Sequence, residues 1–209
     1  MPTLTKKPMP TIGVDKYTIF PMTDDGLTTP GKATYGEAMS IPGAVEIAPT
    51  DNGATDTFDA DNGAYVIEDY LEKIGHEITN ADIPPELDAM MRGIERKDNG
   101  VEVTKTTKAP YFAVAWRITK ADGNYRLVRY YKGKYGFASS VGGKTKPSEG
   151  AADKQTAKAT YAAVARDCDE KIYYYIDTDE LPENVSVETA LDKWFSDPDW
   201  YPSDSVETV

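Results

Sequence analysis

The chain is poor in the residue types on which most catalytic and metal sites depend. Its 209 residues include one histidine, His76, and one cysteine, Cys168. A single cysteine excludes a disulfide within the chain, which fits synthesis in a reducing cytoplasm. A lone histidine cannot complete a metal set, and Cys168 has no clear catalytic partner. We therefore expect a structural His76, a Cys168 thiol in or beside a turn, and no metal or cofactor.

Long apolar runs and an excess of basic residues are also missing. No stretch of about 18 apolar residues exists, so we expect no membrane-spanning helix. Lys6 and Lys7 are not followed by the apolar run of a signal peptide, so we expect no secretory leader. The 35 acidic residues outnumber the 23 basic ones, which gives a formal net charge of -12. Tight DNA binding normally needs the opposite balance, so we expect repulsion from DNA, although solubility alone would explain the same charge.

Two sequence motifs resemble ligand-binding loops but lack required residues. Gly142–Thr145 is similar to the end of a phosphate-binding loop, but Ala138 stands where that pattern needs a glycine. Asp59–Gly63 is similar to the start of a calcium loop, but Ala64 and Tyr70 replace its required glycine and glutamate. We interpret Asp59–Gly63 as a hairpin turn. Carboxylates are abundant, so a two-carboxylate hydrolase stays open as an alternative.

Turn signals and short β-type runs predict a mainly β fold. Five Asp-Gly or Asn-Gly pairs tolerate the positive φ of tight turns, and the runs between them are rich in Tyr, Val, Ile and Thr. We expect an antiparallel β-sandwich or barrel with one flanking α-helix. The predicted strands are Val14 to Met22, Ala44 to Ala48, Lys73 to Thr79, Val101 to Thr106, Tyr111 to Thr119, Asn124 to Tyr131, Thr156 to Ala165 and Lys171 to Ile176.

Four of these strands are predicted to form two hairpins. The first joins Tyr111–Thr119 to Asn124–Tyr131, and the second joins Thr156–Ala165 to Lys171–Ile176. In the second, Tyr173–Tyr175 places aromatic rings on both faces, which argues against free exposure. In the first, alternate residues form the expected core face, namely Phe112, Val114, Trp116 and Ile118.

Helix signals are fewer. Asp82 or Ile83 is expected to cap a helix that stops at Gly93. A second short helix is expected from Ser186 to Phe195, with Ser186 as its cap. The first should dock on the sheet through residues at helical spacing, namely Leu87, Met90, Met91 and Ile94. Irregular structure is expected for residues 1–10, for Gly142–Lys154 and for the acidic end 197–209, whose Trp200 and Tyr201 should dock on the chain's own domain or on a neighbour.

The order of several short segments resembles one known family. Ile12–Tyr17 followed by Thr23–Leu27 is similar to the opening strand and turn of the major tail proteins of phages with long, non-contractile tails. The resemblance covers roughly residues 12–178. It continues through Ile41–Ile47, Thr57–Tyr65, Ala81–Leu87, Ala109–Tyr111 and Tyr130–Lys134.

This resemblance implies a structural virion protein that is not an enzyme. Family members form hexameric rings that stack into a hollow tail tube, through which DNA passes during ejection. The implied partners are further copies of the chain, the tape-measure protein, the tail terminator and the distal tail proteins, and the implied place of synthesis is the host cytoplasm. The implied organisation is an N-terminal arm (1–11), a tail-tube β domain (12–178) with a long loop (51–71), and an acidic C-terminal extension (179–209).

Candidate assembly residues follow from this organisation. The stretch 51–71, too extended for a tight hairpin, suits a loop that reaches a neighbouring ring. Its ring-stacking candidates are Phe58, Asp61, Asn62, Tyr65 and Tyr70. Polar positions on predicted strands are candidates to face the lumen, namely Glu46, Asp56 and Glu77.

Three alternatives stay open beside the tail tube. One is a tube subunit of a contractile tail or a phage-derived bacteriocin. The second, from another class, is an acidic-site hydrolase, which should have a deep pocket with carboxylates of raised pKa. The third is a surface adhesin, which should have a signal peptide or a sorting tail.

Overall fold

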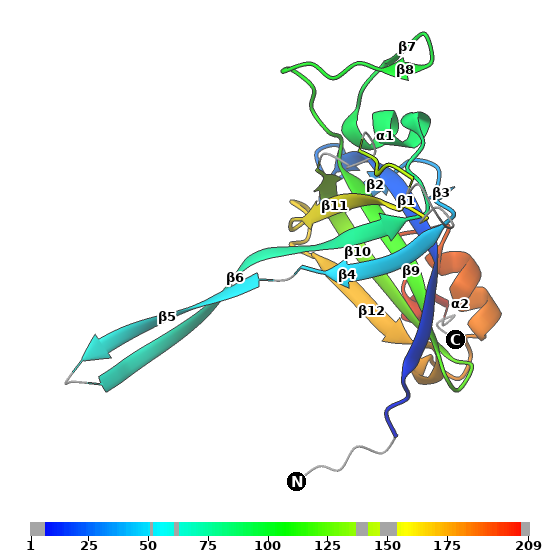
Figure 1. Ribbon diagram of the computed structural model, residues 1–209. Coiled ribbons are helices and arrows are strands. Elements are labelled where there is room, and N and C mark those ends of the chain that lie inside the picture. The colour runs from blue at the N-terminus through cyan, green and yellow to red at the C-terminus, as the bar shows by residue number, and fades with distance from the viewer. Residues whose placement is uncertain (1–6, 51, 61–62, 137–141, 147–153, 206–209) are drawn as a thin grey trace. The chain divides into compact units, whose positions relative to one another are not determined.

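The computed structural model describes residues 7–50, 52–60, 63–136, 142–146 and 154–205. For residues 52–60, 63–73 and 204–205 it describes the backbone alone. The fold is mainly β, with a large antiparallel sheet and two α-helices (Figure 1). This confirms the predicted fold class, a mainly β fold with one flanking α-helix. The chain divides into two compact units, and the predicted boundary at residue 178 falls inside the first. Unit 1 comprises Met1–Ala44, Tyr111–Lys132 and Ala165–Val209, and unit 2 comprises Val45–Pro110 and Gly133–Val164.

Unit 1 is built on two long strands, β1 and β9. Its strand order is β2-β1-β9-β10, with β3 also paired to β1 and β12 paired to β10. The predicted β9–β10 hairpin is confirmed, and its turn is closed where the Lys120 N–H donates to the Asn124 carbonyl at 2.8 Å. The elements are β1 (Thr11–Asp25), β2 (Ala33–Tyr35), β3 (Met39–Ser40), β9 (Phe112–Lys120), β10 (Tyr125–Tyr135), β12 (Tyr173–Asp177), α2 (Val187–Trp194) and the 3-10 turns η1 (Thr178–Glu180) and η2 (Pro202–Ser205).

Helix α2 covers a sheet face that the sequence pattern did not identify as core. The Ser186 Oγ accepts the Thr189 N–H at 3.1 Å, as expected for an N-cap. Buried α2 residues then pack on β1, β9 and β10. The predicted face, with Phe112, Val114 and Trp116, is buried too, so β9 is buried on both sides. The cluster under α2 consists of Phe20, Ala113, Ala115, Leu127, Val185, Ala190, Trp194 and Trp200.

Unit 2 is built on strand β6. Strand β11 pairs with β6 from Ala157 opposite Asn80 to Ala163 opposite Ile74, and β4 and β5 also neighbour β6. His76 lies on β6, is fully buried and stacks on the Tyr161 ring at 4.9 Å. Burial lowers the pKa of His76 to about 3, so it is neutral at physiological pH. The elements are β4 (Ala44–Pro49), β5 (Asn52–Ala60), β6 (Gly63–Asn80), α1 (Pro85–Arg92), β7 (Arg96–Lys97), β8 (Gly100–Val101) and β11 (Ala157–Ala163).

The second predicted hairpin is wrong. Both of its strands form, but they pair with different parts of β10 and not with each other. Residues 126–130 of β10 pair with β12, and residues 133–135 pair with β11. The turn between β11 and β12 spans residues 167–169, where the half-buried Cys168 lies, as predicted. Alternation along a strand shows its faces but not its partner, and this is why the pairing was missed.

The predicted long loop at 51–71 is also wrong. The backbone forms antiparallel strands β5 and β6, in register from Gly53 opposite Leu71 to Ala60 opposite Gly63. That register agrees with the hairpin turn predicted for Asp59–Gly63, although residues 61 and 62 lie outside the described part of the chain. A two-residue connection is enough for a hairpin, so the length of this stretch did not exclude one.

Two local details of unit 2 correct the sequence analysis. Helix α1 has Pro84 at its N-cap, not Asp82 or Ile83, but it ends as predicted at Gly93, which has the left-handed φ of 66°. The predicted strand Val101–Thr106 is reduced to β8. The chain leaves β8 for a turn in which the Thr104 N–H donates to Thr107 Oγ1 at 3.1 Å.

The docking face of α1 also differs from the predicted one. Of the four residues expected there, Met91 is buried, while Leu87, Met90 and Ile94 are half-buried. The other buried positions include Asp88 and Arg92. Their side chains form an ion pair at 2.7 Å, which allows two charges to occupy a mostly buried face.

Gly75 on β6 offers a test of strand packing. A Cβ at this position would lie 2.1 Å from the Tyr161 carbonyl oxygen of β11. We therefore expect Gly75→Ala to lower the free energy of unfolding by about 3 kcal/mol, because the backbone of one strand must move. Urea denaturation followed by circular dichroism measures this. The control is Gly13→Ala, where nothing lies within 4 Å of the added methyl, and a loss as small as that of this control would contradict the expectation.

Candidate functional site

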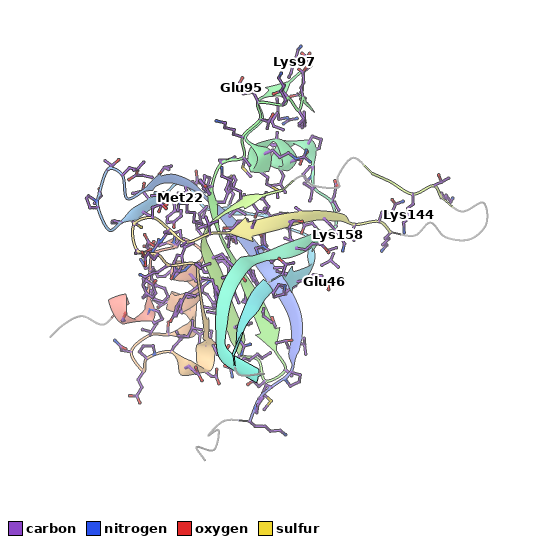
Figure 2. The ribbon with its side chains drawn as sticks, turned by 90° about the vertical axis from the view of Figure 1, so that its left-hand side faces the viewer. Met22, Glu46, Glu95, Lys97, Lys144 and Lys158 are labelled. Atoms are coloured by element: carbon purple, nitrogen blue, oxygen red, sulfur yellow. The ribbon has the colours of Figure 1, made fainter. Side chains whose placement is uncertain are left out.

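The lumen candidates lie on three neighbouring strands. Glu46 is exposed on β4, and Glu77 on β6 accepts a hydrogen bond from Lys158 on β11 at 2.6 Å. The hydrogen bond to Glu77 raises the pKa of Lys158, and the charge of Glu46 adds to this effect. Figure 2 labels Glu46 and Lys158, which lie in the same region of that view. Asp56 lies on β5. The structure therefore places two of the three candidates beside one lysine.

The ring-stacking candidates fall on the β5–β6 hairpin. Phe58 lies on β5, and Tyr65 and Tyr70 lie on β6. Asp61 and Asn62 lie outside the described residues. Strand β5 pairs with β6 on one side, and no strand of the described chain pairs with its other side. The hairpin thus offers an open backbone edge.

Strand β12 provides a second open edge, with exposed aromatic side chains. It pairs with β10 on one side, and in the part of the chain that the structure describes no strand pairs with the other. Tyr173 and Tyr175 are 43% and 54% exposed, with ring centroids 6.3 Å apart. The sequence analysis argued against free exposure of these rings, whereas in the single chain both are exposed. Exposed aromatic rings on an open strand edge are a typical feature of interfaces.

The exposed pair of rings continues into the protein. Tyr130 on β10 lies 5.4 Å from Tyr173, and Trp116 on β9 lies 5.4 Å from Tyr130. Tyr17 on β1 follows at 6.1 Å. The last three rings are buried. The β12 edge is therefore supported by packed rings and is expected to hold its shape when a partner binds.

Two buried arginines form a cluster that the sequence analysis missed. Arg129 is fully buried and lies 4.4 Å from the Trp194 ring centroid, and no acidic side chain within the described residues pairs with it. Arg166 is 3% exposed and donates to both oxygens of Asp169, at 2.9 and 2.5 Å. It also donates to Asp199. A buried cation requires such partners, because its desolvation costs several kcal/mol.

Other buried charges of unit 1 are paired. Lys132 donates to Asp25 at 2.5 Å and to Asp167 at 3.0 Å, and Asp177 accepts from Arg126 at 2.7 Å and also from Lys120. Hydrogen bonds from Arg126 and Lys120 lower the pKa of Asp177, although partial burial opposes them.

The carboxyl pKa shifts do not favour the hydrolase alternative. The shifts resolved among the described carboxyl groups, those of Asp25, Asp122, Asp169 and Asp177, are all downward. A carboxyl general acid needs the opposite shift. In the described residues, no group of three or more His, Cys, Asp or Glu side chains could hold a metal ion. No helix in the same part of the chain is long and apolar enough to cross a membrane.

Neither the family models nor the curated proteins include a match to this sequence.

Proposed function

We propose that this chain is a major tail tube protein, a subunit that assembles as stacked hexameric rings around a channel for DNA. The β12 edge is the observation that supports this most directly. It combines a strand edge with which no other strand of the described residues pairs and the exposed Tyr173 and Tyr175, and tyrosine is one of the residues enriched at protein interfaces. The resemblance of residues 12–178 to major tail proteins supplies the kind of assembly.

The β5–β6 hairpin supports self-assembly in a second way. A two-stranded hairpin is only marginally stable in water unless a third strand or another surface packs against it. Strand β5 has β6 as its single neighbour within the described chain. A neighbouring ring would provide the missing surface. Phe58, Asp61, Asn62, Tyr65 and Tyr70 remain the ring-stacking candidates.

The acidic charge suits a channel along which DNA slides. Glu46, Asp56 and Glu77 remain the lumen candidates, and the tape-measure protein would fill the same channel before ejection. Six chains would carry a formal charge of -72, six times the -12 of one chain. Interface burial has to outweigh this repulsion, which salt limits to a range of about 8 Å at physiological ionic strength.

The proposal predicts that salt promotes tube formation. Negative-stain electron microscopy of the purified protein should show rings or tubes of uniform width, and the tubes should lengthen as salt concentration rises because repulsion between chains is screened. Size-exclusion chromatography on the same samples measures the remaining free subunit. Tubes that shorten as salt rises would contradict the electrostatic argument, and a strict monomer under all conditions would contradict the proposed function.

A further inference from the structure

Residues 197–203, which we call the strap, form a segment of unit 1 that is held by the side chains around it. The strap follows α2 and reads Asp-Pro-Asp-Trp-Tyr-Pro-Ser. Pro198, Trp200 and Pro202 are buried, whereas Asp197 is exposed. Both prolines disfavour continuation of the α2 helix. The strap is therefore a short, irregular, acidic and aromatic segment held by its surroundings.

The backbone of the strap is bound by Arg129. The guanidinium donates to the carbonyl oxygen of Asp197 at 3.2 Å and to that of Trp200 at 2.9 Å. It also lies 5.4 Å from the ring centroid of Tyr201. Because its partners are carbonyls and rings, this buried cation needs a segment in place to satisfy it.

The side chains of the strap are bound by a second set of groups. Arg166 donates to Asp199, and the hydroxyls of Tyr131 and Tyr201 are 2.5 Å apart. The Lys171 Nζ lies 4.9 Å from the Tyr201 ring centroid. The residues that surround the strap, which we call the arginine pocket, are Arg129, Tyr131, Arg166, Lys171 and Tyr174.

The chemistry of this contact is that of an interface between proteins. Tyrosine, tryptophan and arginine are the residues that dominate binding energy at such interfaces. The arginine pocket brings three cations together in a chain of net charge -12. Arg166 and Lys171 share Asp169, so the pocket keeps a net positive charge that favours an acidic segment. Ser196 and Asp197, at the end of α2, are exposed. A change of chain direction at these two residues would carry Trp200 out of the cluster under α2, so an incoming strap has to supply its own Trp200 to that cluster.

We propose that the arginine pocket is a peptide-binding site for an acidic, aromatic segment, and that in the assembly it binds the strap of a second copy in exchange for its own. Each contact of the strap is remade by the incoming strap, so exchange costs little free energy. Assembly raises the local concentration of neighbouring straps. This inference rests on the proposed function, because an assembled form is needed to bring a second strap within reach.

Photo-crosslinking of the full chain tests the exchange. Unlabelled protein carries p-benzoylphenylalanine at position 201, where the Tyr201 ring meets Tyr131 and Tyr174. It is mixed with 15N-labelled wild-type protein, irradiated and digested. With the labelled protein in large excess, a neighbouring copy is nearly always labelled. Mass spectrometry then shows whether the pocket peptide joined to residue 201 is unlabelled, from the same chain, or labelled, from another. The control carries the same crosslinker at position 103, which is 48% exposed and lies outside the strap, the arginine pocket and β12, and it should yield no bond to the strap or to Arg166.

We expect unlabelled pocket peptides in dilute protein and labelled ones once copies associate. Asp199→Asn, which weakens the strap contact to Arg166, should change the labelled fraction at least threefold, while Asp192→Asn on the exposed side of α2 should leave it unchanged. Crosslinks confined to the same chain in assembled material would overturn the exchange. Electron microscopy of the same samples separates the two proposals. If tubes form and every crosslink stays within one chain, strap exchange is refuted and the tail tube proposal stands. If labelled crosslinks appear in dimers and no tubes form, the tail tube proposal is refuted and strap exchange is supported.

Discussion

Replacing Arg166 by methionine is expected to lower the free energy of unfolding by about 3–5 kcal/mol, the usual cost of removing one partner from a buried ion pair. The guanidinium is 3% exposed and satisfies Asp169 and Asp199 together. Methionine keeps the length and flexibility of the stem, so the loss reports the missing charge more than a cavity. Both carboxylates would lose a charged partner at once.

Urea denaturation followed by tryptophan fluorescence measures the effect. The matched control is Arg96→Met, because Arg96 lies near the surface and its contact with Glu86 is a long one at 3.8 Å. Such exposed pairs contribute about 0–1 kcal/mol. Arg166→Lys should recover a part of the stability but not all, since lysine cannot bind both oxygens of a carboxylate in the planar manner of arginine. A loss below 1 kcal/mol in Arg166→Met would contradict the role given to this residue.

The pH dependence of the same variant provides an independent measurement. Partial burial alone would raise the pKa of Asp169, but hydrogen bonds from Arg166 and Lys171 outweigh it and lower the pKa from 3.8 to about 2. The folded form therefore binds this proton less readily than the unfolded form. The resulting stability is fully present above about pH 4 and is lost as the pH falls through about 2. The difference in free energy of unfolding between wild type and Arg166→Met should accordingly become smaller as the pH falls from 5 to 2. A difference that stays constant over this range would show that Arg166 does not act through Asp169.

The parts of the fold that the sequence predicted correctly depend on neighbouring residues in the chain. The Asp122-Gly123 turn closes the β9–β10 hairpin, Gly93 ends α1, and Ser186 caps α2. Each of these is a local hydrogen-bonding or φ requirement that particular residue types meet. The pairing of β11 and β12 with one long strand is decided by contacts far apart in the sequence, so no local pattern could indicate it.

The buried arginines show why the candidate site was harder to predict. Arg129 shares one face of β10 with Leu127 and Tyr131 and alternates with Val128 and Tyr130, a pattern that also fits a strand with two mixed faces. What makes its burial possible is the strap, about 70 residues further along the chain, which supplies carbonyl oxygens and aromatic rings. The expectation that Trp200 and Tyr201 would dock is confirmed, since Trp200 is 6% exposed and Tyr201 contacts Tyr131. An arginine among apolar strand residues and a separate acidic, aromatic segment would together have been the usable signal.

The strongest effect on assembly is expected from two lysines on the β12 edge. The double variant Tyr173→Lys and Tyr175→Lys should raise the concentration needed for ring formation at least tenfold, which corresponds to about 1.4 kcal/mol per interface. Lysine on an exposed strand edge opposes pairing with another chain, because its charge would have to be buried. Both tyrosines are exposed in the single chain, so the stability of the monomer should change by no more than about 0.5 kcal/mol per site.

A charge-matched control separates the edge from the net charge. Leu27→Lys with Val103→Lys adds the same two positive charges at positions that are 90% and 48% exposed and belong neither to β12 nor to the β5–β6 hairpin. Both double variants bring the chain from -12 to -10, which weakens the repulsion between copies and by itself favours assembly. Negative-stain microscopy and sedimentation show which variants assemble. If the control still forms rings while the β12 variant stays dispersed, the loss of ring formation is caused by the change at the β12 edge and not by the change in net charge. Rings formed by the β12 variant at the wild-type concentration would remove β12 from the interface and leave the β5–β6 hairpin as the remaining candidate for contact between copies.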